Sequence, residues 1–307
     1  MNRTLTYRLT EKDIPESGTV RASVILSKCM HLSRHEISRL KFDGEILLNG
    51  RRIRVAEQLQ AGDELTVVFP EEKQKPVPAT EAEPDILLEE EDFVIVNKPA
   101  GIPVHPVHGH LDDSLGTILT AHYGRQGKNF VIRPVGRLDM NVSGAMLYAG
   151  NQPAAARLSA QRKHGELTKQ YIALAEGIFE EKEGVIRLPL RKAEGKRQRE
   201  VSDDGKEALT RYSVFRELVL DGIVYSCLSV TIETGRTHQI RAHLSAAGHP
   251  LLGDEMYRGN TKLIRRPALH CFRISLLSPF TLEPLHAEAP LCEDMQRLID
   301  EGQPYKG

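Results

Sequence analysis

The sequence predicts an α+β protein built from a small N-terminal domain and a larger second domain. Three observations lead to this expectation. An acidic, proline-rich segment over residues 71–84 has almost no apolar side chains and should act as a linker. Two helical patterns and a hairpin pattern precede it, and several apolar runs typical of strands follow it. We therefore expect domains at residues 1–70 and 85–307.

Length and composition set outer limits on the class of protein. A chain of 307 residues with 40% hydrophobic residues can bury one large core and one small core. No apolar run approaches the ~18 residues that span a bilayer, and the first residues lack the apolar core of a signal peptide, so we expect a cytoplasmic protein. The four cysteines form no C-x-x-C pair and are expected to be reduced thiols. Nothing indicates a coiled coil, so we expect a monomer.

The formal net charge of −1 conceals a regional split. Residues 1–70 carry 11 Lys/Arg against 9 Asp/Glu, and residues 93–307 carry 28 against 24. Residues 71–92 carry only 2 against 9. One acidic connector therefore masks two mildly basic domains, which permits binding to RNA without requiring it.

The elements of the first domain follow from local signals. Residues 20–29 predict a short helix, and Ser33 with Glu36 fits a capping box that opens a second helix, which Gly44 would end. The Asn-Gly pair at 49–50, between apolar residues, predicts a hairpin. Residues 65–69 predict a further strand.

Basic side chains gather around the predicted junction of the second helix and the hairpin. They are Arg34, Arg39, Lys41, Arg51, Arg52 and Arg54. With these residues, the segment 20–69 resembles the S-four RNA-binding domain, named after a ribosomal protein. The resemblance implies that Arg34, Arg39 and Arg51 contact RNA phosphates, which provides affinity rather than sequence choice. The alternative is an ordinary solvated basic surface.

In the second domain, one carboxylate stands beside an arginine in a turn, Gly136-Arg137-Leu138-Asp139. An Asp presented in this way suggests covalent or acid–base chemistry. The apolar run 145–149 predicts a buried strand, which would anchor the turn on a rigid edge. The alternative is that Asp139 only shapes the turn through hydrogen bonds.

Arg137-Leu138-Asp139, followed by Ser-Gly at 143–144, resembles the signature of RNA pseudouridine synthases of the RluA branch. The resemblance spans about residues 20–290. It implies the pseudouridine synthase fold, with a central mixed, mainly antiparallel sheet flanked by helices, and a catalytic role for Asp139. The chain departs from the family pattern at three positions: Gly136 replaces a common His, Val142 a Thr and Ala145 a Leu. Gly136 allows backbone angles denied to His, so the turn could be less rigid or accept a different substrate.

Two further motifs also resemble this family. Residues 92–106 predict a buried strand that runs into a proline-rich loop, for which we expect a structural role, with Lys98 and His105 as surface groups. Residues 169–175 predict a strand, and the resemblance implies that Tyr171 lies in the active site, stacks on the base and assists proton transfer. Without the resemblance, an aromatic residue in a strand is more often part of the core.

Residues 231–250 predict a strand, a glycine turn and a helix that ends at Gly248. Ile240 and Leu244 share one helix face, and Arg241 lies next to that face, so its guanidinium can point toward a carboxylate. We pair Arg241 with Asp139, because a neighbouring cation favours the charged carboxylate. The histidines at 238 and 243 are five residues apart, unlike the i, i+4 pair of metal sites, so we expect no metal.

Two more segments complete the candidate site. Residues 187–199 are dense in positive charge around Gly195, so Lys192 and Arg197 are candidates for gripping phosphates, although such runs are often merely solvated. Residues 268–276 resemble the closing strand of the family, in which Leu269 would supply an apolar wall of the uridine pocket.

The sequence has no phosphate loop, metal cluster or redox pair, so we expect a reaction without a cofactor. Isomerisation of uridine, with Arg137 contacting RNA beside the flipped base, fits this expectation. Ribosomal RNA is the first expected partner, and transfer RNA is possible. Two alternatives stay open: a non-catalytic RNA-binding protein or chaperone acting in ribosome assembly, and a glycoside hydrolase. The hydrolase would need a second carboxylate paired with Asp139.

Overall fold

The computed structural model describes residues 3–70, 74, 77–78, 80–107 and 112–306. The chain forms two compact units, Met1–Lys73 and Gln74–Gly307, so the division falls within the acidic segment at 71–84. Six residues of that segment, 71–73, 75, 76 and 79, lie outside the described residues. The end of the segment belongs to the second unit, where Glu83 contacts His122 and Arg125 at 2.5 Å each. No helix in the described ranges is long and apolar enough to cross a membrane.

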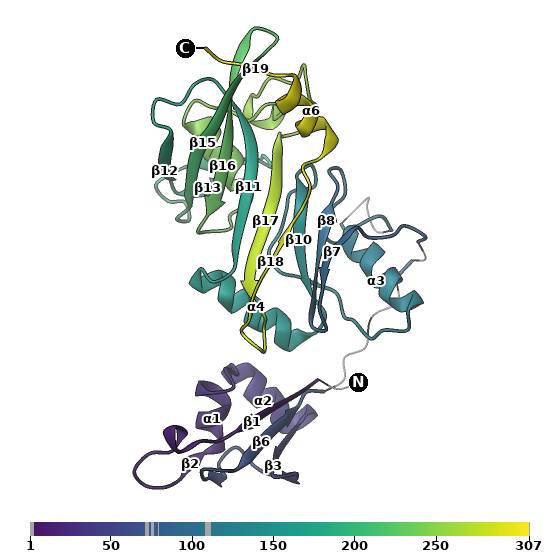
Figure 1. Cartoon of the computed structure of the whole chain (residues 1–307), viewed down its shortest axis with the longest axis vertical. Coiled ribbons are helices and arrows are strands. Elements are labelled where there is room, and N and C mark those ends of the chain that lie inside the picture. The colour runs from purple at the N-terminus through teal and green to yellow at the C-terminus, as the bar shows by residue number, and fades with distance from the viewer. Residues whose placement is uncertain (1–2, 71–73, 75–76, 79, 108–111, 307) are drawn as a thin grey trace. The chain divides into compact units, whose positions relative to one another are not determined.

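The first unit combines short helices with a small sheet (Figure 1). Its elements are β1 (Thr4–Arg8), the 3-10 turn η1 (Glu11–Asp13), β2 (Val20–Arg21), α1 (Ala22–Lys28), α2 (Arg34–Asp43), β3 (Glu45–Leu48), β4 (Arg51–Arg52), β5 (Gln58–Leu59) and β6 (Glu64–Val68). The main sheet has the order β1-β6-β3-β4, and β2 pairs with β5. The helices and the sheet enclose a separate apolar core that includes Ile25, Leu40 and Leu65.

Most local signals in the first unit produce the expected elements. Ser33 caps α2 in a reciprocal capping box with Glu36, and α2 ends at Gly44. Asn49 and Gly50 both have positive φ, as a tight hairpin between β3 and β4 requires. The first helix begins two residues later than expected, because Val20–Arg21 instead pair with Gln58–Leu59. The sequence analysis also missed β1, which pairs along its whole length with β6.

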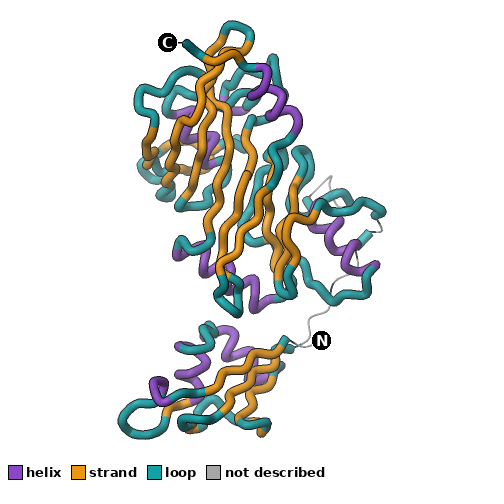
Figure 2. The backbone as a smooth tube through the Cα atoms, viewed as in Figure 1, coloured by secondary structure: helices purple, strands orange, loops and turns teal. Residues whose placement is uncertain are grey.

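The second unit is built on one large sheet with helices and loops around it (Figure 2). Its first elements are β7 (Ile86–Glu89), β8 (Phe93–Lys98), α3 (Leu115–Arg125), β9 (Arg133–Pro134), β10 (Ser143–Ala149), α4 (Gln152–His164), β11 (Thr168–Glu176) and β12 (Glu183–Arg187). They are followed by β13 (Leu190–Lys192), β14 (Arg199–Val201), β15 (Leu209–Leu220), β16 (Ile223–Ile232), α5 (Gln239–Ala246), the 3-10 turn η2 (Glu255–Tyr257), β17 (Leu269–Leu277), β18 (Pro284–Glu288), α6 (Glu293–Glu301) and β19 (Gln303–Pro304).

The sheet of the second unit is mixed but mainly antiparallel. Its described strands run in the order β12-β15-β16-β11-β17-β10-β8-β7, and β9, β18 and β19 pair beside this path. Among the described strands, only β10 and β17 pair in parallel. At that junction Gly144 has φ +106°, and a Cβ there would lie 2.2 Å from the carbonyl oxygen of Cys271. Glycine is therefore required for the close approach of β10 to β17.

The core of the second unit is centred on β10, all seven residues of which are buried. Helix α4 packs on β10 and β17, starting at the Asn151 cap and ending at Gly165 in the left-handed conformation. A fully buried strand explains the continuous apolar run expected at 145–149, because both faces of the sheet are covered here. The turn that carries Asp139 enters this rigid strand directly.

Candidate active site

The Asp139 turn is fixed at both of its ends. Val142 donates its backbone N–H to the Asp139 carbonyl oxygen at 3.1 Å, just before β10 begins. The carbonyl oxygen of Met140 accepts hydrogen bonds from the Gly101 N–H at 2.9 Å and from Lys98 Nζ at 2.8 Å. The turn is thereby attached to the loop that follows β8.

Lys98 is a structural clamp rather than the surface group expected from the sequence. Its side chain is 0% exposed, and Nζ donates to the carbonyl oxygens of Pro99, Ile102 and Met140 at 2.8 Å each. Three carbonyl acceptors match the three N–H groups of an ammonium. Burial lowers the pKa of Lys98 to about 7, although the Asp139 charge opposes this shift. His105, in contrast, is exposed as expected.

Helix α5 brings Arg241 to Asp139. Arg241 Nη1 lies 3.0 Å from Asp139 Oδ2, the pair expected from the helical phasing. The start of α5 is fixed by the Gln239 side chain, whose Oε1 accepts from the Arg236 N–H at 3.0 Å and the Thr234 hydroxyl at 2.8 Å. The turn and the helix therefore meet through one ion pair.

Asp254 binds the other side of the same guanidinium. The sequence alone had indicated no role for this residue. Its carboxylate accepts from Arg241 Nε at 2.6 Å and from Nη2 at 2.8 Å, and it is 1% exposed. Burial alone would lower the pKa of Arg241, but the hydrogen bonds and charges of Asp254 and Asp139 outweigh it and raise this pKa. The Tyr257 ring lies 5.1 Å from the guanidinium carbon. Arg241 is therefore a fixed cation that orients Asp139.

His238 is a second neighbour of Asp139 without an assigned role from the sequence. Its Nε2 lies 3.8 Å from Asp139 Oδ2, and its Nδ1 lies 3.2 Å from the Tyr257 hydroxyl. It precedes α5 with φ +55°, a left-handed conformation unusual for a side-chain-bearing residue. Burial lowers the pKa of His238, with the Asp139 charge opposing, so the ring favours its neutral form.

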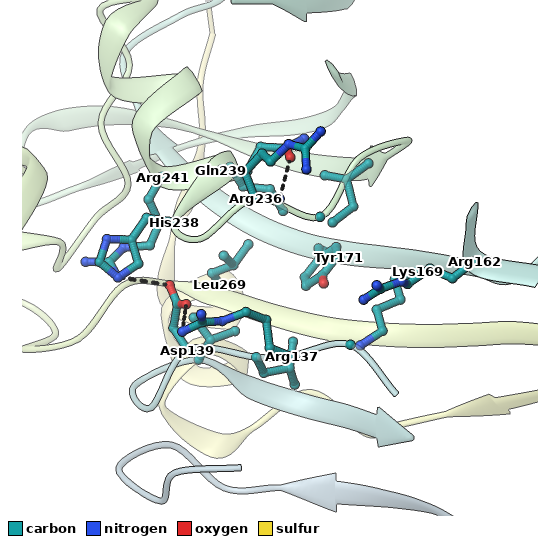
Figure 3. A pocket seen from close by; sticks show the side chains of 16 residues that line it. Arg137, Asp139, Arg162, Lys169, Tyr171, Arg236, His238, Gln239, Arg241 and Leu269 are labelled. Carbon is teal, nitrogen blue, oxygen red and sulfur yellow. Dashed lines mark hydrogen bonds and ion pairs between the residues drawn. The ribbon is translucent and has the colours of Figure 1, made fainter. Parts of the chain in front are cut away.

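A pocket opens over this carboxylate, and its space, including the part open to solvent, amounts to about 590 Å³. Asp139, Arg137, Tyr171, Arg241 and Leu269 all line it. Figure 3 shows Tyr171 and Leu269 between the Asp139 end and the opposite end of the pocket. Burial raises the pKa of Tyr171 well above 10, so its phenol stays protonated at neutral pH and can donate a hydrogen bond.

Arg137 lies at the more exposed side of the pocket. Its side chain is 54% exposed, Nη2 lies 4.0 Å from Asp139 Oδ1, and Nη1 donates to the Thr237 hydroxyl at 3.1 Å. It is thus close to the carboxylate yet open to solvent. This combination suits contact with a large ligand better than a scaffold role.

The remaining basic candidates do not line this pocket. Lys192 and Arg197 are exposed on the β13–β14 hairpin and its connection. In the first unit, Arg34 is exposed, Arg39 lies 3.9 Å from Asp43, and Arg51 lies 3.1 Å from Glu57. Ion pairs between solvent-exposed side chains are weak, so these arginines can leave their carboxylate partners and contact phosphates instead.

His243, whose spacing from His238 does not fit a metal pair, does not line this pocket. His243 is buried, with one ring nitrogen 2.9 Å from the Thr210 hydroxyl and the other 2.9 Å from the Leu188 carbonyl oxygen. Both of its nitrogens therefore already have partners. Within the described ranges, no three His, Cys, Asp or Glu side chains group in a way that could hold a metal ion.

Comparison with known proteins identifies the relatives of this chain. Residues 92–246 match the family model described as RNA pseudouridylate synthase. An uncharacterized RNA pseudouridine synthase of Bacillus subtilis (strain 168), YhcT, is 36% identical over 261 residues, which cover 85% of this chain and 84% of that protein. Ribosomal large subunit pseudouridine synthase D of Xanthomonas campestris pv. campestris is 30% identical over 311 residues, 95% of this chain and 92% of its own length.

Structural comparison supports the same assignment at the level of the fold. The human RNA pseudouridylate synthase domain containing 1 superposes with a TM-score of 0.61 over 75% of this chain and 92% of its own, at 24% identity. The α+β pseudouridine synthase fold, with its mixed sheet flanked by helices, is therefore confirmed. Half of the residues match the family model, and relatives more than 30% identical span most of the chain, so this protein belongs to the RNA pseudouridylate synthase family.

Proposed function

We propose that this protein isomerises specific uridines in RNA to pseudouridines, with Asp139 as its catalytic residue. The observation that carries the proposal is the position of one carboxylate, oriented by Arg241, at a pocket walled by Tyr171 and Leu269. The reaction breaks the bond between uracil N1 and ribose C1′, rotates the base, and joins C5 to C1′. The proton on C5 leaves and N1 gains one, so the product has the mass of the substrate.

Each residue of the pocket has a proposed part in this reaction. Asp139 acts on the ribose or the uracil, by covalent attack or by proton abstraction. Arg241 stabilises and aims the carboxylate. Tyr171 stacks on the base and assists proton transfer, with its phenol protonated at neutral pH. Leu269 closes the apolar wall, and Arg137 contacts the RNA from which the uridine has flipped.

A glycoside hydrolase is disfavoured by the position of Asp254. It is a carboxylate near Asp139, but it is 1% exposed and bound through both oxygens to Arg241. It cannot serve as the second acid that such enzymes place across the scissile bond. Product identity separates the two reactions, because hydrolysis releases free uracil, whereas isomerisation keeps the base attached to the ribose and releases only the C5 proton.

We propose ribosomal RNA as the substrate class, since relatives such as the Xanthomonas campestris protein are named for the ribosomal large subunit. We further propose that residues 1–70 are an S-four-type RNA-binding domain joined by residues 71–84 to the catalytic domain at 85–307. In that domain Arg34, Arg39 and Arg51 contact phosphates, as Lys192 and Arg197 do in the second. The protein would act as a cytoplasmic monomer, without cofactor or metal.

Mapping carbodiimide-reactive pseudouridines in total RNA, with and without this gene, tests the proposal. The expected result is the loss of one or a few positions in ribosomal RNA, restored when the gene is returned. Loss confined to transfer RNA would correct the substrate class only. An unchanged pseudouridine map would contradict the proposed function and favour a non-catalytic RNA-binding protein.

A further inference from the structure

Lys169 is a buried cation that the proposed reaction does not use. It is 7% exposed and lines the pocket, two residues before Tyr171 on the same face of β11. Within the described part of the chain, its Nζ has no hydrogen-bond partner. A buried lysine without a partner is rare, because desolvation of an ammonium is costly unless something compensates it.

A second cationic side chain, Arg162, lies close to Lys169. Arg162, in the last turn of α4, lines the same end of the pocket. Burial lowers the pKa of Lys169, with Cys271 opposing this shift and the Arg162 charge adding to it. A Cβ built on Gly136 would lie 3.0 Å from Arg162 Nη1 and 3.7 Å from Lys169 Nζ. The two cationic groups therefore converge on the backbone of the Asp139 turn, where glycine leaves room.

The whole pocket has an excess of positive charge. Its sixteen lining residues include five Lys or Arg and a single carboxylate, Asp139, which Arg241 already neutralises. Figure 3 shows Arg162 and Lys169 at one end of the pocket and His238 and Arg241 at the other. A neutral uracil carbonyl could accept one hydrogen bond at the Lys169 end, but it could not compensate the positive charges of two cationic side chains.

We propose that Lys169 and Arg162 form an anion subsite that binds a phosphodiester group attached to the uridine held in the pocket. Gly136, beside the cations, stands three positions before Asp139, so their Cα atoms lie at most about 11 Å apart. One nucleotide can bridge this span, with its sugar at Asp139 and a phosphate at Lys169. The subsite rests on the proposed function for the identity of that nucleotide, but its binding does not require turnover.

The test compares uridine with uridine 5′-monophosphate and uridine 3′-monophosphate, using ligand-observed NMR titrations of the full chain. The wild type should bind one monophosphate about 10-fold more tightly than uridine, since a hydrogen bond to a charged group contributes that much. The preferred isomer shows which phosphate enters the subsite. Lys169→Met should abolish the preference, whereas Lys163→Met, which removes an exposed lysine beside Arg162, should retain it.

Thermal unfolding of Lys169→Met separates a binding role from a structural one. Removal of an uncompensated buried charge should leave the melting temperature equal to or above that of the wild type. The subsite would be overturned if Lys169→Met still bound a monophosphate more tightly than uridine, or if it lost affinity equally for uridine and its monophosphates. A melting temperature below that of the wild type would also overturn it. Equal affinity of the wild-type protein for all three ligands would likewise overturn the subsite. If the preference depends on Lys169 but no pseudouridine forms, the subsite stands and the proposed function fails.

Discussion

The two ends of the pocket each contain a buried basic side chain, and the groups around these two side chains differ. Arg241 has carboxylates on two sides, Asp139 at 3.0 Å and Asp254 at 2.6 Å. Lys169 has no hydrogen-bond partner among the described residues, and its charged neighbour is the cation Arg162. The difference indicates that Arg241 belongs to the scaffold of the site, because the fold itself neutralises it. Lys169 instead needs a partner that arrives with the substrate.

Lys98 is a third buried basic residue, and its hydrogen-bond partners differ from those of both Arg241 and Lys169. It is buried like the other two, but its partners are three backbone carbonyl oxygens rather than carboxylates. Carbonyl dipoles compensate an ammonium only in part, and its pKa is correspondingly lowered to about 7. The stability of the protein should therefore respond differently to the loss of each cation.

The largest effect is expected for Arg241→Met. This change leaves the Asp254 carboxylate buried without its two hydrogen bonds, so the free energy of unfolding should fall by about 3–5 kcal/mol. Urea unfolding measures this loss. Adding Asp254→Leu to the same variant should restore most of the stability but not the turnover, because Asp139 would still lack its orienting partner. An Arg241→Met protein as stable as the wild type would contradict the scaffold role.

Lys98→Met should have an intermediate effect, with a loss of about 2 kcal/mol in unfolding free energy. Three carbonyl oxygens lose a charged donor, while the cost of burying an ammonium disappears. The Met140 carbonyl retains its hydrogen bond from the Gly101 N–H, which limits the damage to the Asp139 turn. No change in stability would show that Lys98 does not clamp the turn.

The contribution of Lys98 to the free energy of unfolding should increase as the pH rises above 7. The pKa of Lys98 is about 7 in the folded chain, against its ordinary value of 10.5 in an unfolded chain. Between these values the unfolded chain binds more protons, so the contribution of Lys98 to stability rises with pH, by at most about 1.4 kcal/mol per unit. It is lost as the pH falls through 7. The difference in unfolding free energy between wild type and Lys98→Met, measured from pH 6 to pH 9, should follow this direction; a flat difference would argue against it.

The smallest effect on turnover is expected in the first unit. Replacing Arg34, Arg39 and Arg51 with Gln should leave turnover at saturating RNA unchanged. The affinity for RNA should fall, and the slope of log affinity against log salt should flatten by about 0.7–0.9 for each lost phosphate contact. Filter binding over a range of salt concentrations measures both quantities. An unchanged slope would mean that these arginines form an ordinary solvated surface.

Local sequence signals could predict the elements that depend on near neighbours. The α2 capping box, the Asn49-Gly50 hairpin and the buried run of β10 all depend on residues close in the chain. The pairing of Arg241 with Asp139 was also predictable, because helical phasing limits where a side chain on α5 can point. The strand β1 was missed, since its pairing partner β6 lies some sixty residues away.

The roles of Asp254 and Lys98 could not be predicted in the same way. Asp254 sits just before a 3-10 turn, and only the packing of that turn on α5 brings its carboxylate to Arg241. Lys98 is the last residue of the hydrophobic strand β8, where a lysine normally marks the exit to solvent. Its burial depends on the loop that folds back over it, and one hint was available: the adjacent prolines fix that loop close to the strand.

The most direct test of the account is the Asp139→Asn variant, assayed for tritium release from RNA labelled at uracil C5. Asparagine keeps the shape of the side chain but cannot carry the negative charge or remove a proton. We expect tritium release to be abolished, while the dissociation constant for RNA and the melting temperature stay close to those of the wild type. Release at a near-normal rate by a folded Asp139→Asn protein would contradict it.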